Sequence, residues 1–310
     1  MLKYQWNIIG QDNTLKALEQ DLASGKLSHA YLFEGTDNVG KFTAAKIFAH
    51  IAQCPNDFCH TCSTCLEIEK GYHSDTIEVA DDGESIKIEA VREALAKLNL
   101  SKQSPYKIFL VQNIERMTTE AANAILKTLE DPPENVMFLL TTSRLQDVLP
   151  TIISRVRVMH FHRLSDEQVK EVLLQLFPLA EPAMMDLIAT YAVGKPGKAY
   201  RLMHEPGLLE TYQKRYTAFD VLLQKRDVAD GFVMVNDLVK SAKEEENAHE
   251  LNDFLDLFLA MVRRQMVQAH DDPEAMLRLG KLADKTLHVF DLLKRNVNTR
   301  LLLENLMLSL

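Results

Sequence analysis

The chain has 310 residues, of which 46% are hydrophobic and 25% charged, and its formal net charge is -9. This length is typical of two or three domains, and the composition is that of a globular protein. The negative charge argues against a protein that holds nucleic acid through its overall field, because DNA binding draws on clustered Lys and Arg. The sequence opens without a signal-like apolar segment and has no stretch apolar enough to cross a membrane, so we expect a cytoplasmic protein with no membrane partner.

A glycine-rich loop follows the first apolar segment of the chain. Residues 35–42 match the phosphate-binding pattern, with its required residues at Gly35, Gly40 and Lys41. The preceding residues are apolar, as in a buried strand, and from Phe42 onward apolar residues return at helical spacing. This strand, loop and helix context favours anion binding by loop amides and a helix N-terminus. Phe42, however, stands where the magnesium-binding Ser or Thr is expected.

All four cysteines of the chain lie close together, at Cys54, Cys59, Cys62 and Cys65. In a reducing compartment such clustering favours a metal over disulfides, and four thiolates complete a tetrahedral zinc ion. We therefore predict a closed, structural zinc module over residues 54–65. Free thiols or an iron-sulfur site are the alternatives, the latter with poorly fitting spacing. The nearby His50, His60 and His73 are interpreted as surface or packing residues, because the thiolates already suffice.

Four further apolar segments read as strands, over residues 76–79, 107–111, 136–140 and 156–161. The segment 107–111 is apolar almost throughout, which is typical of a parallel strand covered on both faces. Residues 118–129 form a helical pattern that Pro132 should end. Alternating strands and helices predict a doubly wound α/β domain, to which we assign residues 1–163.

The remaining sequence has helical periodicity only. Residues 165–177 predict a helix with Ser165 as its N-cap and a capping-box pattern. Residues 164–205 form a compact helical unit punctuated by Pro and Gly, and residues 206–310 form a second region of amphipathic helices.

The residues that would support ATP hydrolysis are incomplete. Hydrolysis needs a hydroxyl on magnesium and an acidic pair at a strand end. Phe42 has no oxygen, and the strand over residues 107–111 is followed by the neutral amides Gln112 and Asn113. Glu115 is the nearest carboxylate and should lie beyond the strand. We therefore expect no ATP hydrolysis at this site, although Lys41 and the loop amides leave weak ATP or ADP binding open.

Several motifs together carry a family resemblance. They are, in chain order, Ile9–Gln11, residues 62–73, residues 124–133, residues 138–142 and Ile153–Arg155. Over about residues 5 to 200 the chain resembles the bacterial clamp-loader subunits of the AAA+ superfamily. The resemblance implies an α/β AAA+ P-loop domain with a zinc-binding insertion, then a small helical lid domain and an all-α C-terminal collar domain that joins an oligomeric ring.

The resemblance also implies a role for Arg155. In this group the Arg after the motif Ser acts as an arginine finger in the ATP site of a neighbouring subunit, and Ser154 and Arg155 are retained while Val156 replaces the usual Cys. Gly197 takes the place of the lid Arg that senses nucleotide. The implied protein is a non-hydrolysing member of the group that works with the gamma/tau and delta subunits to load the sliding clamp onto primed DNA.

Three other interpretations stay open at this point. The first is a gamma/tau-like clamp-loader ATPase with a degenerate loop, against which Gln112 and Asn113 argue. A zinc-dependent nucleic-acid-binding module is the second, and the acidic balance of the chain argues against it. The third is a metabolic P-loop kinase, which would need magnesium ligands of its own.

Overall fold

The computed structural model describes residues 2–79, 83, 85–244, 248–293 and 297–310. These residues divide into two compact units, one of residues 1–180 and 194–198 and the other of residues 181–193 and 199–310. The units are described separately below. The predicted division into domains of residues 1–163, 164–205 and 206–310 stays a prediction.

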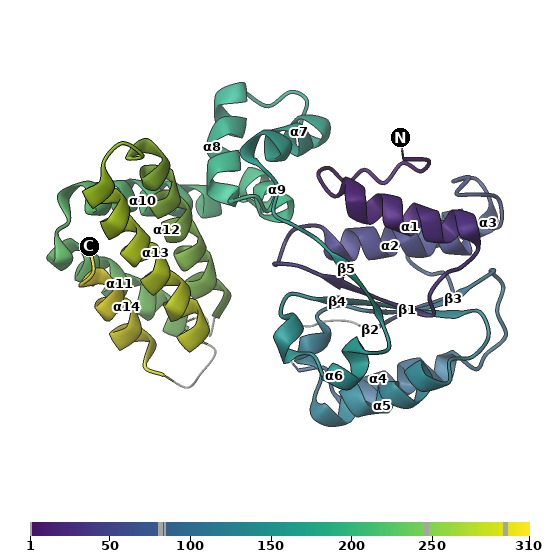
Figure 1. The fold of residues 1–310 in the computed structure, drawn as a ribbon. Helices are drawn as coiled ribbons and strands as arrows, with labels where there is room; N and C mark the ends of the chain where they lie inside the picture. Colours follow the sequence, from purple (N-terminus) through teal and green to yellow (C-terminus); the bar gives the residue numbers. More distant parts are fainter. Residues whose placement is uncertain (1, 80–82, 84, 245–247, 294–296) are drawn as a thin grey trace. The chain divides into compact units, whose positions relative to one another are not determined.

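A five-stranded parallel sheet forms the centre of the first unit (Figure 1). Its strands are β1 Ala30–Glu34, β2 Thr76–Val79, β3 Lys107–Val111, β4 Val136–Thr142 and β5 Arg157–His160. They lie in the order β2-β3-β4-β1-β5, with every neighbouring pair parallel. The predicted parallel α/β sheet is thereby confirmed, and all five predicted strands are present.

Helices cover both faces of this sheet (Figure 1). α1 Asp12–Ser24 and α2 Lys41–Gln53 lie on one face, and α4 Ile88–Lys97 and α5 Thr119–Glu130 on the other. The unit also contains α3 Ser63–Glu69, α6 Pro150–Ile153 and α7 Asp166–Leu176, with short 3-10 turns η1 Ile114–Arg116 and η2 Leu145–Asp147. Alternate residues of β3 serve different cores: Ile108 and Leu110 pack on the α1 and α2 side, and Phe109 and Val111 on the α4 and α5 side. Burial on both faces explains the continuous apolar run in the sequence.

Sequence signals set the ends of two of these helices. Ser165 caps α7 through a complete capping box with Gln168, as predicted. Helix α5 ends at Glu130, two residues before Pro132, which confirms the predicted end of this helix.

The second unit is helical. It contains α8 Pro182–Ala192, α10 Pro206–Lys225, α11 Val228–Glu244, α12 Ala248–Gln268, α13 Pro273–Leu293 and α14 Thr299–Met307, and it takes the end of α9 Pro196–His204. Phe219 of α10 is fully buried in its core, with its ring centroid 4.8 Å from that of Phe254 and 5.1 Å from that of Phe258 of α12. Among the residues described, no helix has the length and apolarity needed to span a membrane.

Candidate functional site

The glycine-rich loop joins β1 to α2 at the carboxyl edge of the sheet. Gly35 has φ +153°, and a Cβ atom there would lie 2.3 Å from the Phe161 carbonyl oxygen, so only glycine fits. Gly40 has φ +97° and precedes the first residue of α2. The strand, loop and helix order predicted for a phosphate-binding loop is therefore present.

Lys41, the lysine of this loop, is turned onto the loop itself. Its Nζ atom donates hydrogen bonds to the carbonyl oxygens of Gly35 at 2.6 Å and Thr36 at 2.8 Å. The residue is only 6% exposed. Burial lowers the pKa of the ammonium, against the opposing effect of Asp37. The cation that would contact a phosphate is thus engaged by backbone carbonyls of its own loop.

Phe42 contributes packing at the position where a magnesium ligand is expected. Its side chain packs against the hydrophobic core on the α1 and α2 side of the sheet. The Nζ atom of Lys46, one turn later in α2, lies 4.5 Å from the centroid of the Phe42 ring. No oxygen atom from this side chain is available to a cation.

The end of β3 likewise lacks carboxylates. Gln112 and Asn113 follow the strand, and the Asn113 N–H donates to Thr141 Oγ1 at 3.1 Å. Glu115 lies in the 3-10 turn η1, beyond the strand as the sequence predicts. Its Oε1 atom accepts hydrogen bonds from the Ser143 N–H at 3.0 Å and the Ser143 hydroxyl at 2.6 Å. The nearest carboxylate thus fixes the segment after β4.

The start of α9 lies directly on the glycine loop. The Gly197 N–H donates to the Asn38 carbonyl oxygen at 2.9 Å, and a Cβ atom at Gly197 would lie 3.2 Å from Asn38 atoms. A larger residue there would push against the loop. Arg201, one turn further along α9, pairs with Glu205, with Nε 3.1 Å from Oε1.

Arg155 lies between α6 and β5, where its guanidinium has partners within the chain. It donates to Glu130 Oε1 at 2.7 Å, to the Thr151 carbonyl at 2.8 Å and to Ser154 Oγ at 3.1 Å. The side chain remains 33% exposed. It borders a surface hollow of about 620 Å³ that is also lined by Ser28, His29, Leu129, Glu130, Ser154, Val156 and Arg157. A positive group beside an open hollow can reach an anion outside the chain.

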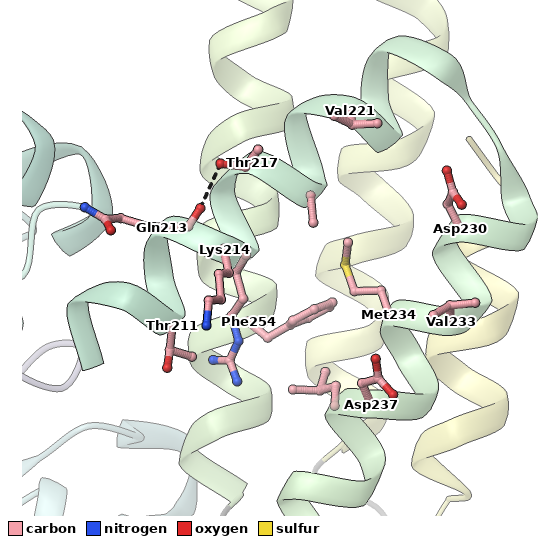
Figure 2. Close-up of a pocket in the computed structure, with 13 residues that line it drawn as sticks. Thr211, Gln213, Lys214, Thr217, Val221, Asp230, Val233, Met234, Asp237 and Phe254 are labelled. Atoms are coloured by element: carbon pink, nitrogen blue, oxygen red, sulfur yellow. Dashed lines mark hydrogen bonds between the residues drawn. The ribbon is translucent and has the colours of Figure 1, made fainter. Parts of the chain in front are cut away.

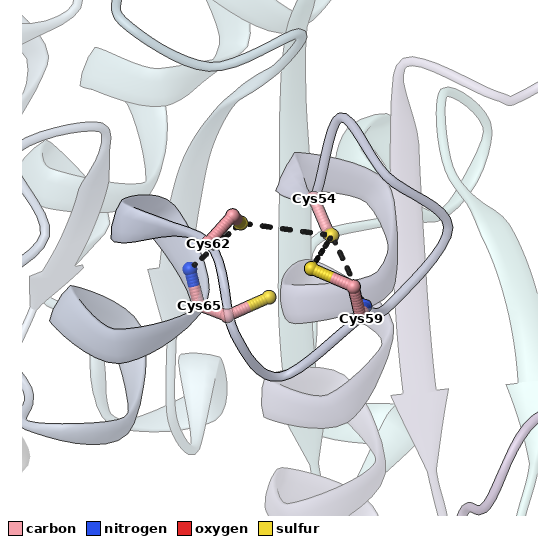
Figure 3. A group of neighbouring side chains, drawn as sticks. All are labelled: Cys54, Cys59, Cys62 and Cys65. Carbon is pink, nitrogen blue, oxygen red and sulfur yellow. Dashed lines mark hydrogen bonds between the residues drawn. The ribbon is translucent and has the colours of Figure 1, made fainter.

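The four cysteines converge between α2 and α3 (Figure 3). The Sγ atom of Cys54 lies 3.8 Å from that of Cys59 and 4.0 Å from that of Cys62, and all four sulfur atoms lie within 4.8 Å of one another. A tetrahedral zinc ion with bonds of about 2.3 Å would separate its sulfur ligands by about 3.8 Å. The predicted residues thus form a set that fits one tetrahedral ion.

Local hydrogen bonds favour the thiolate form of one of these cysteines. Thr61, through its backbone N–H and its side chain, and then the N–H of Cys62 lower the pKa of Cys59 to about 5. Cys62 also caps α3, because its Sγ atom accepts from the Cys65 N–H at 3.5 Å. The loop that carries Cys59 and Cys62 therefore both positions sulfur atoms and starts α3.

The second unit has a larger hollow between α10, α11 and α12 (Figure 2). Its volume is about 920 Å³, and it is lined by Thr211, Gln213, Lys214, Arg215, Thr217, Ala218, Val221, Asp230, Val233, Met234, Asp237, Leu238 and Phe254. Val233 is 61% exposed at its margin. The hollow combines an apolar floor with Lys214 on α10 and Asp230 and Asp237 on α11.

Two features of these sites were missed by the sequence reasoning. Glu130 holds Arg155 although 25 residues separate them. Asn38 receives the first turn of α9 across an even longer stretch of sequence. Glu130 lies in residues 124–133, one of the motifs that carry the family resemblance, and this motif was the only sequence feature that pointed to Glu130. No sequence feature indicated the contact between Gly197 and Asn38.

Sequence comparison with known proteins assigns this chain to a family. The sequence model of the family described as "DNA polymerase III, delta subunit" matches residues 10–165, about half of the chain. The DNA polymerase III subunit delta' of Bacillus subtilis (strain 168) is 32% identical over 82% of this chain and 76% of its own length.

Relatives with other subunit names match over shorter parts. The DNA polymerase III subunit tau of Escherichia coli (strain K12) is 34% identical over 61% of this chain and 30% of its own length. The subunit gamma of Buchnera aphidicola subsp. Acyrthosiphon pisum is 37% identical over 54% of this chain and 47% of its own length. The chain therefore spans less than half of these two relatives.

A solved structure also aligns with the chain. It is a gamma subunit-related protein from Thermotoga maritima, with 20% identity and a TM-score of 0.48 over 94% of this chain and 97% of that one. The family assignment comes from the sequence matches. Because the family model covers half of the chain and the Bacillus subtilis relative is matched over most of its length, this chain belongs to the DNA polymerase III delta-subunit family of clamp-loader proteins.

Proposed function

We propose that this chain is a non-hydrolysing clamp-loader subunit of the delta-prime type. It would help to load the sliding clamp onto primed DNA, in the cytoplasm, with gamma/tau and delta subunits as its partners. One observation carries this proposal: Phe42 and the pair Gln112 and Asn113 occupy the positions where hydrolysis needs a hydroxyl and carboxylates. The Bacillus subtilis relative named delta' supports it, since the match extends over 82% of the chain.

The geometry of the loop also supports a weak or absent nucleotide interaction. Lys41 would have to leave two carbonyl oxygens to meet a phosphate. Gly197 brings the start of α9 onto Asn38 of the same loop. A nucleotide would compete with both contacts.

Arg155 is proposed to act in trans, in the ATP site of a neighbouring gamma/tau subunit. Its guanidinium is permanently charged and planar, so it can stabilise the charge that develops on a transferring phosphoryl group. Within the chain Glu130 and the Thr151 carbonyl fix its position beside an open hollow. An ion pair that is partly exposed costs little to break, so the side chain can exchange Glu130 for a phosphate.

The cysteine cluster is proposed to hold one structural zinc ion. Cys54, Cys59, Cys62 and Cys65 would supply its four ligands, which leaves no position for substrate. The ion would link the end of α2 to the start of α3.

The hollow on the second unit is proposed to receive a helix of a neighbouring clamp-loader subunit, which would make residues 206–310 the collar. Its apolar floor offers burial, and its charges of both signs would fix the register of the incoming helix. This part of the proposal concerns assembly rather than chemistry.

A gamma/tau-like ATPase is the second candidate, favoured by the relatives named tau and gamma. The missing magnesium ligands argue against it. A zinc-dependent nucleic-acid-binding module is less well supported, because the net charge is -9.

The proposal is tested by rebuilding the clamp loader from this chain and its gamma/tau and delta partners. ATP turnover with clamp and primed DNA is measured for the wild type, Arg155→Ala and Arg155→Lys. We expect Arg155→Ala to slow the site that it serves by about a thousandfold, with little rescue by Lys because it lacks the planar fork.

Arg144→Ala is the matched control, because Arg144 is also exposed and ion-paired, to Asp147. It should leave turnover unchanged. Unchanged turnover in the Arg155→Ala assembly, with the variant incorporated as efficiently as the wild type, would refute the finger.

A further inference from the structure

A second group of metal-binding side chains lies beside the cysteine cluster. His50 is in the last turn of α2, His60 lies between Cys59 and Cys62, and Glu69 is the last residue of α3. A ring nitrogen from each histidine and a carboxylate oxygen of Glu69 all lie within 4.8 Å of one another. None of these three residues belongs to the thiolate set.

His50 provides the buried nitrogen that needs a partner. The residue is 7% exposed, and its Nε2 atom has no hydrogen-bond partner in the described part of the chain. Buried polar atoms in folded proteins are nearly always satisfied, so an orphaned imidazole nitrogen calls for an explanation. A cation coordinated by this nitrogen would supply one.

His60 and Glu69 are already paired at the outer side of the group. His60 Nδ1 lies 2.8 Å from Glu69 Oε1, and both side chains are about half exposed. The His60 ring is close to that of His50, with centroids 5.4 Å apart.

Phe58 holds the two imidazoles in position. Its ring centroid lies 4.8 Å from that of His50 and 4.1 Å from that of His60. These contacts restrict both rings, which favours metal binding because less freedom is lost on ligation.

Two imidazoles and one carboxylate form a ligand set that binds zinc and leaves one position open. Tetrahedral ligation with bonds of about 2.05 Å would bring the ligand atoms to about 3.3 Å from one another. Glu69 and His60 lie at the surface, so their side chains can adjust to this spacing from the present 2.8 Å between His60 Nδ1 and Glu69 Oε1.

We propose that His50, His60 and Glu69 form a second divalent-cation site, which binds Zn²⁺ with water in its fourth position. The ion would connect the end of α2, the cysteine loop and the end of α3. The site differs chemically from the thiolate cluster and is independent of the clamp-loader function proposed above.

The test counts zinc in the full chain, purified without a histidine tag. The protein is equilibrated with Zn²⁺, passed through a desalting column and analysed for metal by mass spectrometry. We expect two equivalents in the wild type and one in both His60→Ala and Glu69→Gln. His270→Ala is the matched control, because His270 is exposed beside a carboxylate, Asp271, far from the cysteines in sequence, and it should keep two.

Cobalt(II) substitution identifies which ion is lost. The intense bands of cobalt bound to thiolates should persist in Glu69→Gln, since Glu69 lies outside the segment that carries the cysteines. One equivalent in the wild type together with the thiolate bands of cobalt, or as much zinc in Glu69→Gln as in the wild type, would overturn the second site. If His60→Ala perturbs the cysteine loop, as loss of the thiolate bands would reveal, the Glu69→Gln result decides.

Discussion

At the scale of single residues, the buried carboxylate of Asp75 shows how hydrogen bonds stabilise a charge inside the fold. Asp75 is fully buried just before β2. Burial would raise its pKa, but hydrogen bonds from the N–H groups of Ser104 and Gln103 and from the Ser104 hydroxyl outweigh this, so the pKa lies below its usual value. Lys107 Nζ lies 4.0 Å from Asp75 Oδ1. The carboxylate ties the start of β2 to the segment before β3.

This pKa shift predicts how stability depends on pH. A carboxylate whose pKa is lowered by folding stabilises the native state above its unfolded pKa of about 3.9, and this contribution is lost as the pH falls through the folded value. Asp75→Asn should therefore lower the free energy of unfolding by about 2 kcal/mol at pH 7 and by less below about pH 4.

Urea unfolding followed by tryptophan fluorescence measures this effect, because the one Trp of the chain, Trp6, is buried in the first unit. Asp271→Asn, at an exposed carboxylate in the second unit, is the control and should change nothing. An equal loss for Asp75→Asn at both pH values would contradict the assignment.

At the scale of elements, local signals predicted the helices and strands better than their contacts. The five apolar residues of β3 predicted a doubly covered strand, and Ser165 with Gln168 predicted the start of α7. Such features depend on neighbours in sequence. Two contacts were not predicted: the ion pair of Arg155 with Glu130 and the hydrogen bond of Gly197 with Asn38. Both join residues far apart in sequence, so they depend on how the strands and helices pack, which local periodicity does not encode.

The cysteine module is the element whose order should depend on metal. Cys62→Ser removes a proposed zinc ligand, whereas its hydroxyl oxygen can still cap α3, so the variant tests the metal rather than the cap. We expect it to abolish metal binding by the thiolate cluster and to speed amide hydrogen exchange over residues 54–69 by about tenfold or more, with the sheet unaffected.

Hydrogen-exchange mass spectrometry of the zinc-loaded protein makes this comparison, with Ser63→Ala as the neighbouring control in the exposed first position of α3. Unaltered exchange in Cys62→Ser would show that the module folds without the ion.

At the scale of the whole molecule, the purely helical periodicity of the C-terminal sequence predicted a helical region, and the second compact unit is helical. The sequence did not reveal the hollow on the helical unit, because it is built from three helices that are each amphipathic in an ordinary way. Its proposed role in assembly can be tested without affecting the first unit.

Val233→Asp should weaken incorporation into the assembled clamp loader while leaving the isolated chain folded. The side chain is already 61% exposed, so the carboxylate costs little in the free chain but would be desolvated under a neighbouring helix. Native mass spectrometry of mixtures with the partner subunits measures incorporation. Val267→Asp, 75% exposed on α12 and outside the hollow, should behave like the wild type. Equal incorporation of all three proteins would exclude the hollow as the contact.

The proposed loss of catalysis at the chain's own loop involves all three scales, because it rests on Phe42, on the end of β3 and on the start of α9 together. The most direct test is magnesium-dependent ATP turnover by the isolated chain, measured beside Lys41→Ala and a protein-free blank. We predict that all three give the same rate, since the hydroxyl and the carboxylates that hold magnesium are missing. Turnover by the wild type that requires magnesium and disappears in Lys41→Ala would contradict this account.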